Sequence, residues 1–285
     1  MFIMRTVLPG EKPIFFKACV DVSVNFSSLS KAKPIQGIMR YFLECAYDGT
    51  GFGGWQRQPN APSIQQCIEE ALSIVLKTET SVTGAGRTDA GVHARCMPAH
   101  FDTVSSPEPY RLIHALNAIL EPRIAILDLY PVRDDAHARF SAIDRTYDYL
   151  ITRRKNPFLI DKAYHYSGNL ALEQMTLCCE DLLAHRGFAC FSKAHSDVGS
   201  YLCHVMEAEW KETDDCLIFT IKANRFLRNM VRAIVGTMLE VGRKKMDRQA
   251  FREVLNSGDR SQAGWSVPAK GLYLTRVNYP PEIRI

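Results

Sequence analysis

The stretch GAGRTDAGVHA at positions 84–94 lies between two strand-like segments, 81–83 and 99–102. Its glycines permit positive φ angles and let a neighbouring segment approach closely. Arg87 and Asp89 are two positions apart, so an extended backbone would point both side chains the same way. A carboxylate beside a guanidinium stays ionised, which suits nucleophilic attack and not proton donation. The simpler alternative is a solvated turn with a surface ion pair.

Apolar spacing on both sides of this stretch predicts further strands and helices. Residues 40–47 alternate in polarity, as a half-buried strand does. Ser63 has the pattern of a helix cap, and apolar residues follow it at helical spacing as far as Val75. Downstream, the patterns predict a strand at 99–102, a helix at 109–120 and a strand at 124–130. Together these elements form a first α/β half, which we assign to residues 39–144.

The remainder of the chain repeats this order of elements without repeating the sequence. We therefore predict an α/β protein of the α+β type, with a second α/β half at residues 145–285 and a cleft at the junction. Residues 1–38 differ from the rest, and we expect a poorly structured N-terminal extension or a misassigned start, with one short strand at 20–24. The elements expected in the second half are strands at 145–152, 205–212, 216–223 and 272–279 and helices at 172–185, 227–241 and 247–255.

Composition places the chain among ordinary globular proteins. Hydrophobic residues make up 46% and charged residues 23% of the 285 positions. No apolar run approaches the roughly 20 residues that a membrane-spanning helix needs, and the N-terminus lacks a secretory pattern. We expect a cytoplasmic protein with no membrane partner.

Neither the cysteine spacing nor the net charge of the chain indicates a particular ligand. The nine cysteines contain no C-x-x-C pair, which argues against a structural zinc site and for reduced, buried thiols. Of the net charge of +4, residues 1–38 contribute +3, because they hold five Lys/Arg against Glu11 and Asp21. Composition therefore gives no signal for RNA, and any phosphate-binding surface must come from local clustering.

Residues 86–94, GRTDAGVHA, closely resemble the active-site motif of the tRNA pseudouridine synthase A family. Four further blocks resemble the same family in the same order, and the similarity spans about residues 40–279. These blocks lie at 47–58, 137–149, 224–236 and 271–274.

The resemblance implies an isomerase that converts uridines 38, 39 and 40 of tRNA anticodon arms to pseudouridine, as a homodimer without metal or organic cofactor. It implies two ferredoxin-like halves around an extended mixed, mainly antiparallel sheet with a central cleft. By the same resemblance Asp89 matches the catalytic nucleophile, Tyr147 the tyrosine that stacks on the target base, and Arg87 and Arg232 the accompanying arginines. We also expect tRNA contacts from Arg57, Arg139, Arg145, Arg225 and Arg228.

Taken without the resemblance, several of these residues have a structural alternative. Tyr147 alternates with Tyr149 on one strand face and could be a core aromatic. Arg228 and Arg232 are neighbours at i,i+4 on the predicted helix, where they could form a solvated basic edge. His93 shows neither metal-ligand spacing nor a partner hydroxyl, so we expect a structural hydrogen bond from it.

Two parts of the sequence depart from the family pattern. Cys96-Met97-Pro98 and Trp265 are unusual for the family, and Pro98 predicts an irregular start for the strand at 99–102.

A glycoside or nucleoside hydrolase with an aspartate nucleophile normally needs a second carboxylic acid, which the motif lacks. A tRNA-binding protein with a dead site would have lost Asp89 or Arg87.

Overall fold

The computed structural model describes residues 37–193 and 199–285, which lie within one unit of the chain, Gln36–Ile285. The strand expected at 20–24 lies outside the described residues, as does almost all of the expected extension 1–38. The boundary between 144 and 145 stays a prediction. None of the helices in the described part of the chain has the length and apolar composition needed to cross a bilayer.

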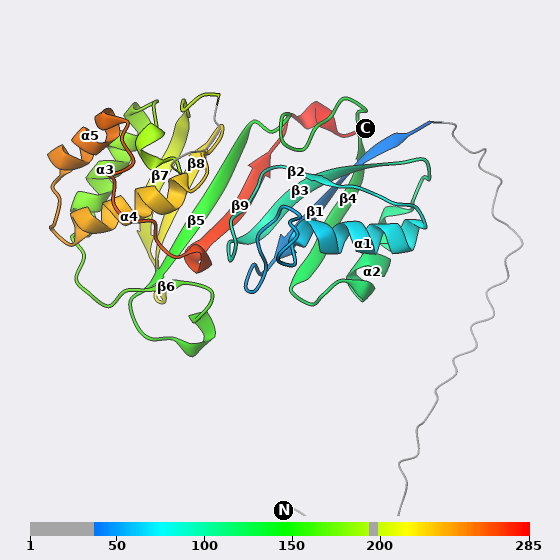
Figure 1. Ribbon diagram of the computed structural model, residues 1–285, viewed down its shortest axis with the longest axis horizontal. Coiled ribbons are helices and arrows are strands. Elements are labelled where there is room, and N and C mark those ends of the chain that lie inside the picture. The colour runs from blue at the N-terminus through cyan, green and yellow to red at the C-terminus, as the bar shows by residue number, and fades with distance from the viewer. Residues whose placement is uncertain (1–36, 194–198) are drawn as a thin grey trace, which may run out of the picture. The chain divides into compact units, whose positions relative to one another are not determined.

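The described strands form one nine-stranded sheet in the order β4-β1-β3-β9-β5-β8-β7, with β2 beside β3 and β6 beside β5 (Figure 1). Neighbours pair antiparallel except for β3 with β9 and β5 with β6. The mixed, mainly antiparallel sheet expected from the sequence is confirmed. The bounds are β1 Met39–Tyr47, β2 Thr83–Gly84, β3 His93–Thr103, β4 Ile124–Val132, β5 Asp144–Thr152, β6 Tyr164–His165, β7 Val205–Glu212, β8 Cys216–Ala223 and β9 Leu272–Asn278.

The last strand, β9, connects the two parts of the sheet. It pairs in parallel with the start of β3, where His93 faces Tyr273, and antiparallel with β5 on its other side. Strands from residues 39–132 therefore lie on one side of β9, and strands from residues 144–223 lie on the other.

Two helices cover the first part of the sheet. Figure 1 shows α1 (Ile64–Leu76) and α2 (Pro109–Ile119) over the strands β1, β3 and β4. The Ser63 hydroxyl accepts a hydrogen bond from Gln66 N at 3.3 Å, so the predicted helix cap is confirmed. The core here is aliphatic and aromatic, and it includes Leu43, Ile64, Ile68, Leu72, Met97, Phe101, Leu112 and Leu116.

Three helices cover the second part, α3 (Leu172–Ala184), α4 (Met230–Gly242) and α5 (Arg248–Ser257). Their apolar faces meet β5, β7 and β8 in a second cluster of buried residues. This cluster includes Tyr149, Met175, Leu182, Phe188, Phe191, Phe219, Ile221, Ile234, Met238 and Phe251.

Strand β3 differs from the sequence prediction, because it begins at His93 and not at residue 99. The expected irregularity is a bulge before Pro98, where Ala94 faces Tyr47 and Met97 faces Cys45. Pro98 itself stays in the strand, and its carbonyl accepts a hydrogen bond from Ala85 N at 2.8 Å. Pro98 faces Glu44 in regular register outside the bulge, so the proline does not end the strand.

Candidate active site

Asp89 lies in the loop between β2 and β3, and its side chain is 27% exposed. The loop turns directly after it, since Val92 N donates a hydrogen bond to Asp89 O at 3.1 Å. Gly91 supplies the positive φ angle, 76°, that this turn requires. Asp89 is thus held at the tip of a tight turn next to β3.

The loop that follows β1 fixes the backbone next to Asp89. Trp55 N donates to Thr88 O at 3.2 Å, and the hydroxyls of Tyr47 and Thr88 are 2.9 Å apart. Gly54 has a φ angle of 101°, and a β-carbon there would lie 2.3 Å from Thr88 O. Only glycine permits this close approach, so the sequence block around Trp55 serves to position the Asp89 loop.

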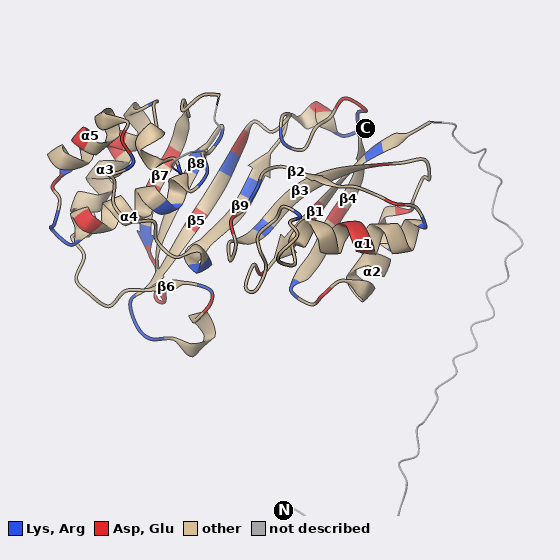
Figure 2. Ribbon diagram, viewed as in Figure 1, with Lys and Arg blue, Asp and Glu red and all other residues tan. Residues whose placement is uncertain are grey.

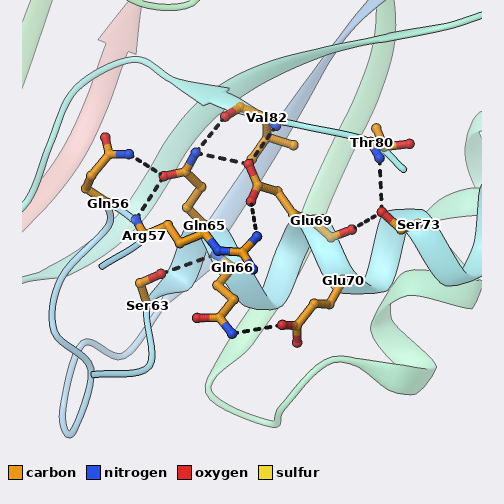
Figure 3. Close-up of polar contacts among 10 residues, drawn as sticks. All are labelled: Gln56, Arg57, Ser63, Gln65, Gln66, Glu69, Glu70, Ser73, Thr80 and Val82. Atoms are coloured by element: carbon orange, nitrogen blue, oxygen red, sulfur yellow. Dashed lines mark hydrogen bonds and ion pairs between the residues drawn. The ribbon is translucent and has the colours of Figure 1, made fainter. Parts of the chain in front are cut away.

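A polar network at the start of α1 holds the segment that enters β2 (Figure 3). Gln65 Nε2 donates to Val82 O at 3.0 Å, and Val82 N donates to the buried carboxylate of Glu69 at 3.1 Å. Gln56 Nε2 and Arg57 N both donate to Gln65 Oε1. The Arg57 guanidinium pairs with Glu69 at 3.3 Å but stays 57% exposed, so it can still meet a ligand.

Helix α4 begins later than the sequence predicts. Asn229 adopts a left-handed conformation with a φ angle of 69°, which interrupts the helical backbone, and the helix starts at Met230 rather than at residue 227. Arg228 therefore lies in the preceding loop, and the expected i,i+4 pair of arginines on one helix is wrong. Arg232 remains in the first turn of the helix.

Both arginines nevertheless reach the Asp89 carboxylate. Arg232 NH1 lies 3.3 Å from Oδ2, while its Nε donates to Val267 O at 2.7 Å. Arg228 Nε lies 3.6 Å from Oδ1, and its side chain is 62% exposed. The N-terminal end of α4 adds a partial positive charge. Two guanidinium groups thus face the two oxygens of the Asp89 carboxylate.

Arg87 does not make the ion pair that its spacing suggested. Its side chain is exposed and has no ion pair with Asp89 in the part of the chain that the structure describes. Strand β2 ends at Gly84, so residues 87–89 are not a strand, and the alternation that would align the two side chains does not apply.

Tyr147 lies on β5, half-buried, where it packs against both core clusters. Its ring meets Phe226 edge to face, with centroids 5.0 Å apart. Burial raises the pKa of Tyr147 to about 12; the charge of Arg145 opposes this shift and that of Asp89 adds to it. The phenol is therefore neutral at physiological pH.

Comparisons with known proteins identify the family to which this arrangement belongs. The sequence profile described as tRNA pseudouridine synthase matches residues 45–141 and 179–280. A tRNA pseudouridine synthase A of Bacteroides thetaiotaomicron is 47% identical over 249 residues, 86% of this chain and 93% of the relative. One of Parabacteroides distasonis is 48% identical over 248 residues, 86% of this chain and 97% of the relative.

The chain belongs to the tRNA pseudouridine synthase family. It is an isomerase that acts on uridine in tRNA. The expected family and reaction class are thereby confirmed, and the rival hydrolase and RNA-binding functions are set aside.

In this synthase Arg145 is tied into the fold instead of projecting to solvent. Its NH1 donates to the carbonyls of Ala142 at 3.1 Å and Asn224 at 2.9 Å. Its NH2 donates to the carbonyl of Ala85 at 3.3 Å and to that of Arg139. Both terminal nitrogens are occupied, so the structure leaves Arg145 little capacity for the tRNA contact that we expected.

Two other predicted tRNA contacts remain accessible. Arg139 is exposed, with its guanidinium 5.3 Å from the centre of the Phe140 ring. Arg225 is half-exposed, and within residues 37–193 and 199–285 its side chain makes no ion pair. Their role in binding tRNA stays a prediction.

His93 has the structural role that the sequence suggested for it. The ring is buried and stacks on Tyr273 with centroids 4.6 Å apart. Its Nδ1 accepts a hydrogen bond from Gly49 N at 3.1 Å, and its Nε2 is 3.1 Å from Lys270 O. Burial lowers the pKa of His93, so the ring is neutral, with Nε2–H donating to Lys270 O.

Proposed function

We propose that the synthase isomerises uridines 38, 39 and 40 in the anticodon arm of tRNA, with Asp89 as the nucleophile. The observation that supports this role is the pairing of the Asp89 carboxylate with Arg232 at 3.3 Å and Arg228 at 3.6 Å. An ionised carboxylate can attack but cannot donate a proton. The relatives of similar length bear the name tRNA pseudouridine synthase A, which supports the proposed substrate.

In the proposed mechanism the target uridine first leaves its stack, at a cost of a few kcal/mol. Asp89 then attacks either the ribose or the base ring, and the bond between C1′ and N1 breaks. The uracil turns, a bond forms between C1′ and C5, and the bond to Asp89 breaks and returns the free carboxylate. The C5 proton leaves and N1 gains a proton. No electron or group transfer takes place, so the reaction needs no cofactor.

The remaining residues act on the base and on the space that it leaves. Tyr147 stacks on the detached uracil with a ring that is oriented by its edge-to-face contact with Phe226. Arg232 holds the Asp89 carboxylate, and the exposed Arg87 occupies the position of the flipped nucleotide. Arg57, Arg139, Arg225 and Arg228 contact tRNA phosphates.

We further propose that the enzyme works in the cytoplasm as a homodimer. Light scattering after size exclusion tests the second point. A homodimer should have a mass near twice 32.2 kDa.

The positions are tested by incubating the purified protein with tRNA transcripts that carry uridine at 38, 39 or 40 and mapping pseudouridine along the chain. We expect modification at these positions by the wild-type protein and none by the Asp89→Asn variant. Matched transcripts with cytidine at all three positions should remain unmodified. Pseudouridine elsewhere in the tRNA would contradict the proposed positions but not the reaction class.

A further inference from the structure

The segment between β5 and β6 presents an aromatic ring to solvent. It contains the short helix η1 (Pro157–Leu159), in which Phe158 is 90% exposed, and Ile160 follows at 64%. The side chain of Asn156 accepts a hydrogen bond from Phe158 N at 3.0 Å, which closes the turn. The ring is therefore displayed by an ordered turn.

Both ends of this segment are anchored to the body of the protein. Arg153 donates to the carbonyl of Gly168 at 2.8 Å at the start. At the far end Lys270 Nζ donates to Ile160 O at 2.6 Å, and the Tyr273 hydroxyl donates to Lys162 O at 2.7 Å. Such anchoring lowers the conformational entropy that the segment itself would lose on binding a ligand.

One anchor leads to the loop that follows β1. The ammonium group of Lys162 pairs with the Asp48 carboxylate, directly after the end of β1. The same loop contains Gly54 and Trp55, which contact the backbone of Thr88 next to Asp89. The segment is thus tied to the loop that positions the candidate nucleophile.

The charge is positive before the exposed ring, and a single carboxylate, that of Asp161, follows the ring within the segment. Arg154 and Lys155 precede it, both are exposed, and neither has an ion pair in the described residues. Figure 2 shows basic residues along this segment, next to the β6 label. An exposed aromatic ring next to unpaired cations is typical of surfaces that bind unpaired nucleotides, because bases stack on the ring and phosphates meet the cations.

A second copy of the chain fits this surface less well than RNA does. Two identical segments facing each other would bring Arg154 and Lys155 of both copies together, and like charges repel. An RNA strand instead supplies the negative charge that these cations lack.

We propose that residues 153–162 form a second contact for the tRNA substrate, in which Phe158 stacks on an unpaired base and Arg154 and Lys155 contact phosphates. The identity of the RNA as tRNA rests on the proposed function. The contact serves binding, because the groups paired with Asp89 in the described residues, Arg228 and Arg232, lie outside this segment.

The test compares three variants by tRNA binding and by steady-state kinetics. Phe158→Ala should raise the Kd and KM for tRNA about tenfold, with kcat unchanged, because it removes one stacked ring. Phe158→Tyr keeps the ring and should stay within about twofold of wild type. Tyr110→Ala is the control: Tyr110 is 77% exposed on α2, and its neighbour Arg111 is already paired with Glu108. This control should bind tRNA as the wild-type protein does.

A salt titration tests the cations. The double variant Arg154→Ala, Lys155→Ala should reduce the slope of log affinity against log salt by about two.

Unchanged tRNA affinity of Phe158→Ala would overturn the proposal, and a loss of dimer mass at unchanged affinity would assign the ring to a contact between copies. If the wild-type protein forms no pseudouridine, the proposed function fails, while the binding comparison still decides the role of the segment.

Discussion

Arg232 and Asp89 are 143 positions apart in the chain, and their side chains meet at 3.3 Å. The contact joins the first turn of α4 to the tip of the loop between β2 and β3. Arg232 is itself oriented by its bond to Val267 O at 2.7 Å. The second part of the sheet and its helices therefore supply the counter-charge for a carboxylate that the first part positions.

Replacing Asp89 with asparagine keeps the side-chain shape but removes its charge. We expect turnover to fall by about 100-fold or more, as happens when a nucleophile is lost. The affinity for tRNA should stay within a few-fold, because the arginines that face the RNA remain. Single-turnover assays and filter binding measure the two quantities separately. Turnover near the wild-type rate would exclude Asp89 as the nucleophile.

The Arg232→Met variant should lose most activity while it stays folded. Both partners of the ion pair are partly exposed, so the free energy of unfolding should fall by only about 1 kcal/mol. Turnover should fall about 100-fold, because the carboxylate loses its orientation. Thermal unfolding and kcat test this pair of expectations.

Arg228→Met is the matched control for that variant. Arg228 contacts the other carboxylate oxygen at 3.6 Å but is 62% exposed, and exposed pairs contribute about 0–1 kcal/mol. We expect a less than about tenfold loss of turnover, with weaker tRNA binding that depends less on salt. Equal losses in both variants would contradict the different roles of the two arginines.

Substitutions of Tyr147 separate its ring from its hydroxyl. Phe keeps the edge-to-face contact with Phe226 and should retain most activity, whereas Ala should lose most of it.

Burial disfavours the phenolate and raises the pKa of Tyr147 to about 12, so the hydroxyl stays protonated at neutral and mildly alkaline pH. The pH–rate profiles of wild type and Tyr147→Phe should coincide from about pH 7 to 10. An alkaline limb present only in the wild-type profile would show that the hydroxyl titrates during the reaction.

Arg145 should act by positioning the Asp89 loop. Its guanidinium links the carbonyl of Ala85, at the start of that loop, to the carbonyl of Asn224 beyond β8. Arg145→Met should lower kcat and the melting temperature while tRNA affinity and its salt dependence hold steady. Arg145→Lys, which can replace part of the bonding, should recover part of kcat. Weaker binding with a shallower salt dependence would make Arg145 a phosphate contact after all.

Much of this fold is predictable from local patterns, because burial alternates along strands and recurs along helices. The expected hairpin, β7 with β8, and the cap at Ser63 have the predicted residues. The approach of Arg232 to Asp89 was expected only through the family resemblance. No local spacing indicates a contact between residues so far apart in the chain.

The features that the sequence did not predict depend on contacts between distant segments. The late start of α4 follows from the left-handed conformation of Asn229, which residues around 227–241 do not indicate. The internal hydrogen bonds of Arg145 were not predicted, because its carbonyl partners come from several segments. The sequence did contain one indication of these internal bonds, because Arg145 alternates with Tyr147 and Tyr149 on a strand. A cation in line with core aromatics needs internal partners.

The fate of the C5 hydrogen of the target uridine distinguishes the two reactions that could take place at Asp89. A synthase and a nucleoside hydrolase both break the bond between C1′ and N1, but only the synthase forms a bond at C5, which forces the hydrogen to leave. With tRNA tritiated at uridine C5, the protein should release tritium to water, liberate no free uracil and leave the mass of unlabelled tRNA unchanged. The two groups paired with Asp89 within the described residues are arginines, which do not donate protons near neutral pH, so they cannot release uracil as a hydrolase acid would. Free uracil without tritium release would contradict the proposed chemistry at Asp89, and the Asp89→Asn variant, which should release neither, controls for tritium lost without catalysis.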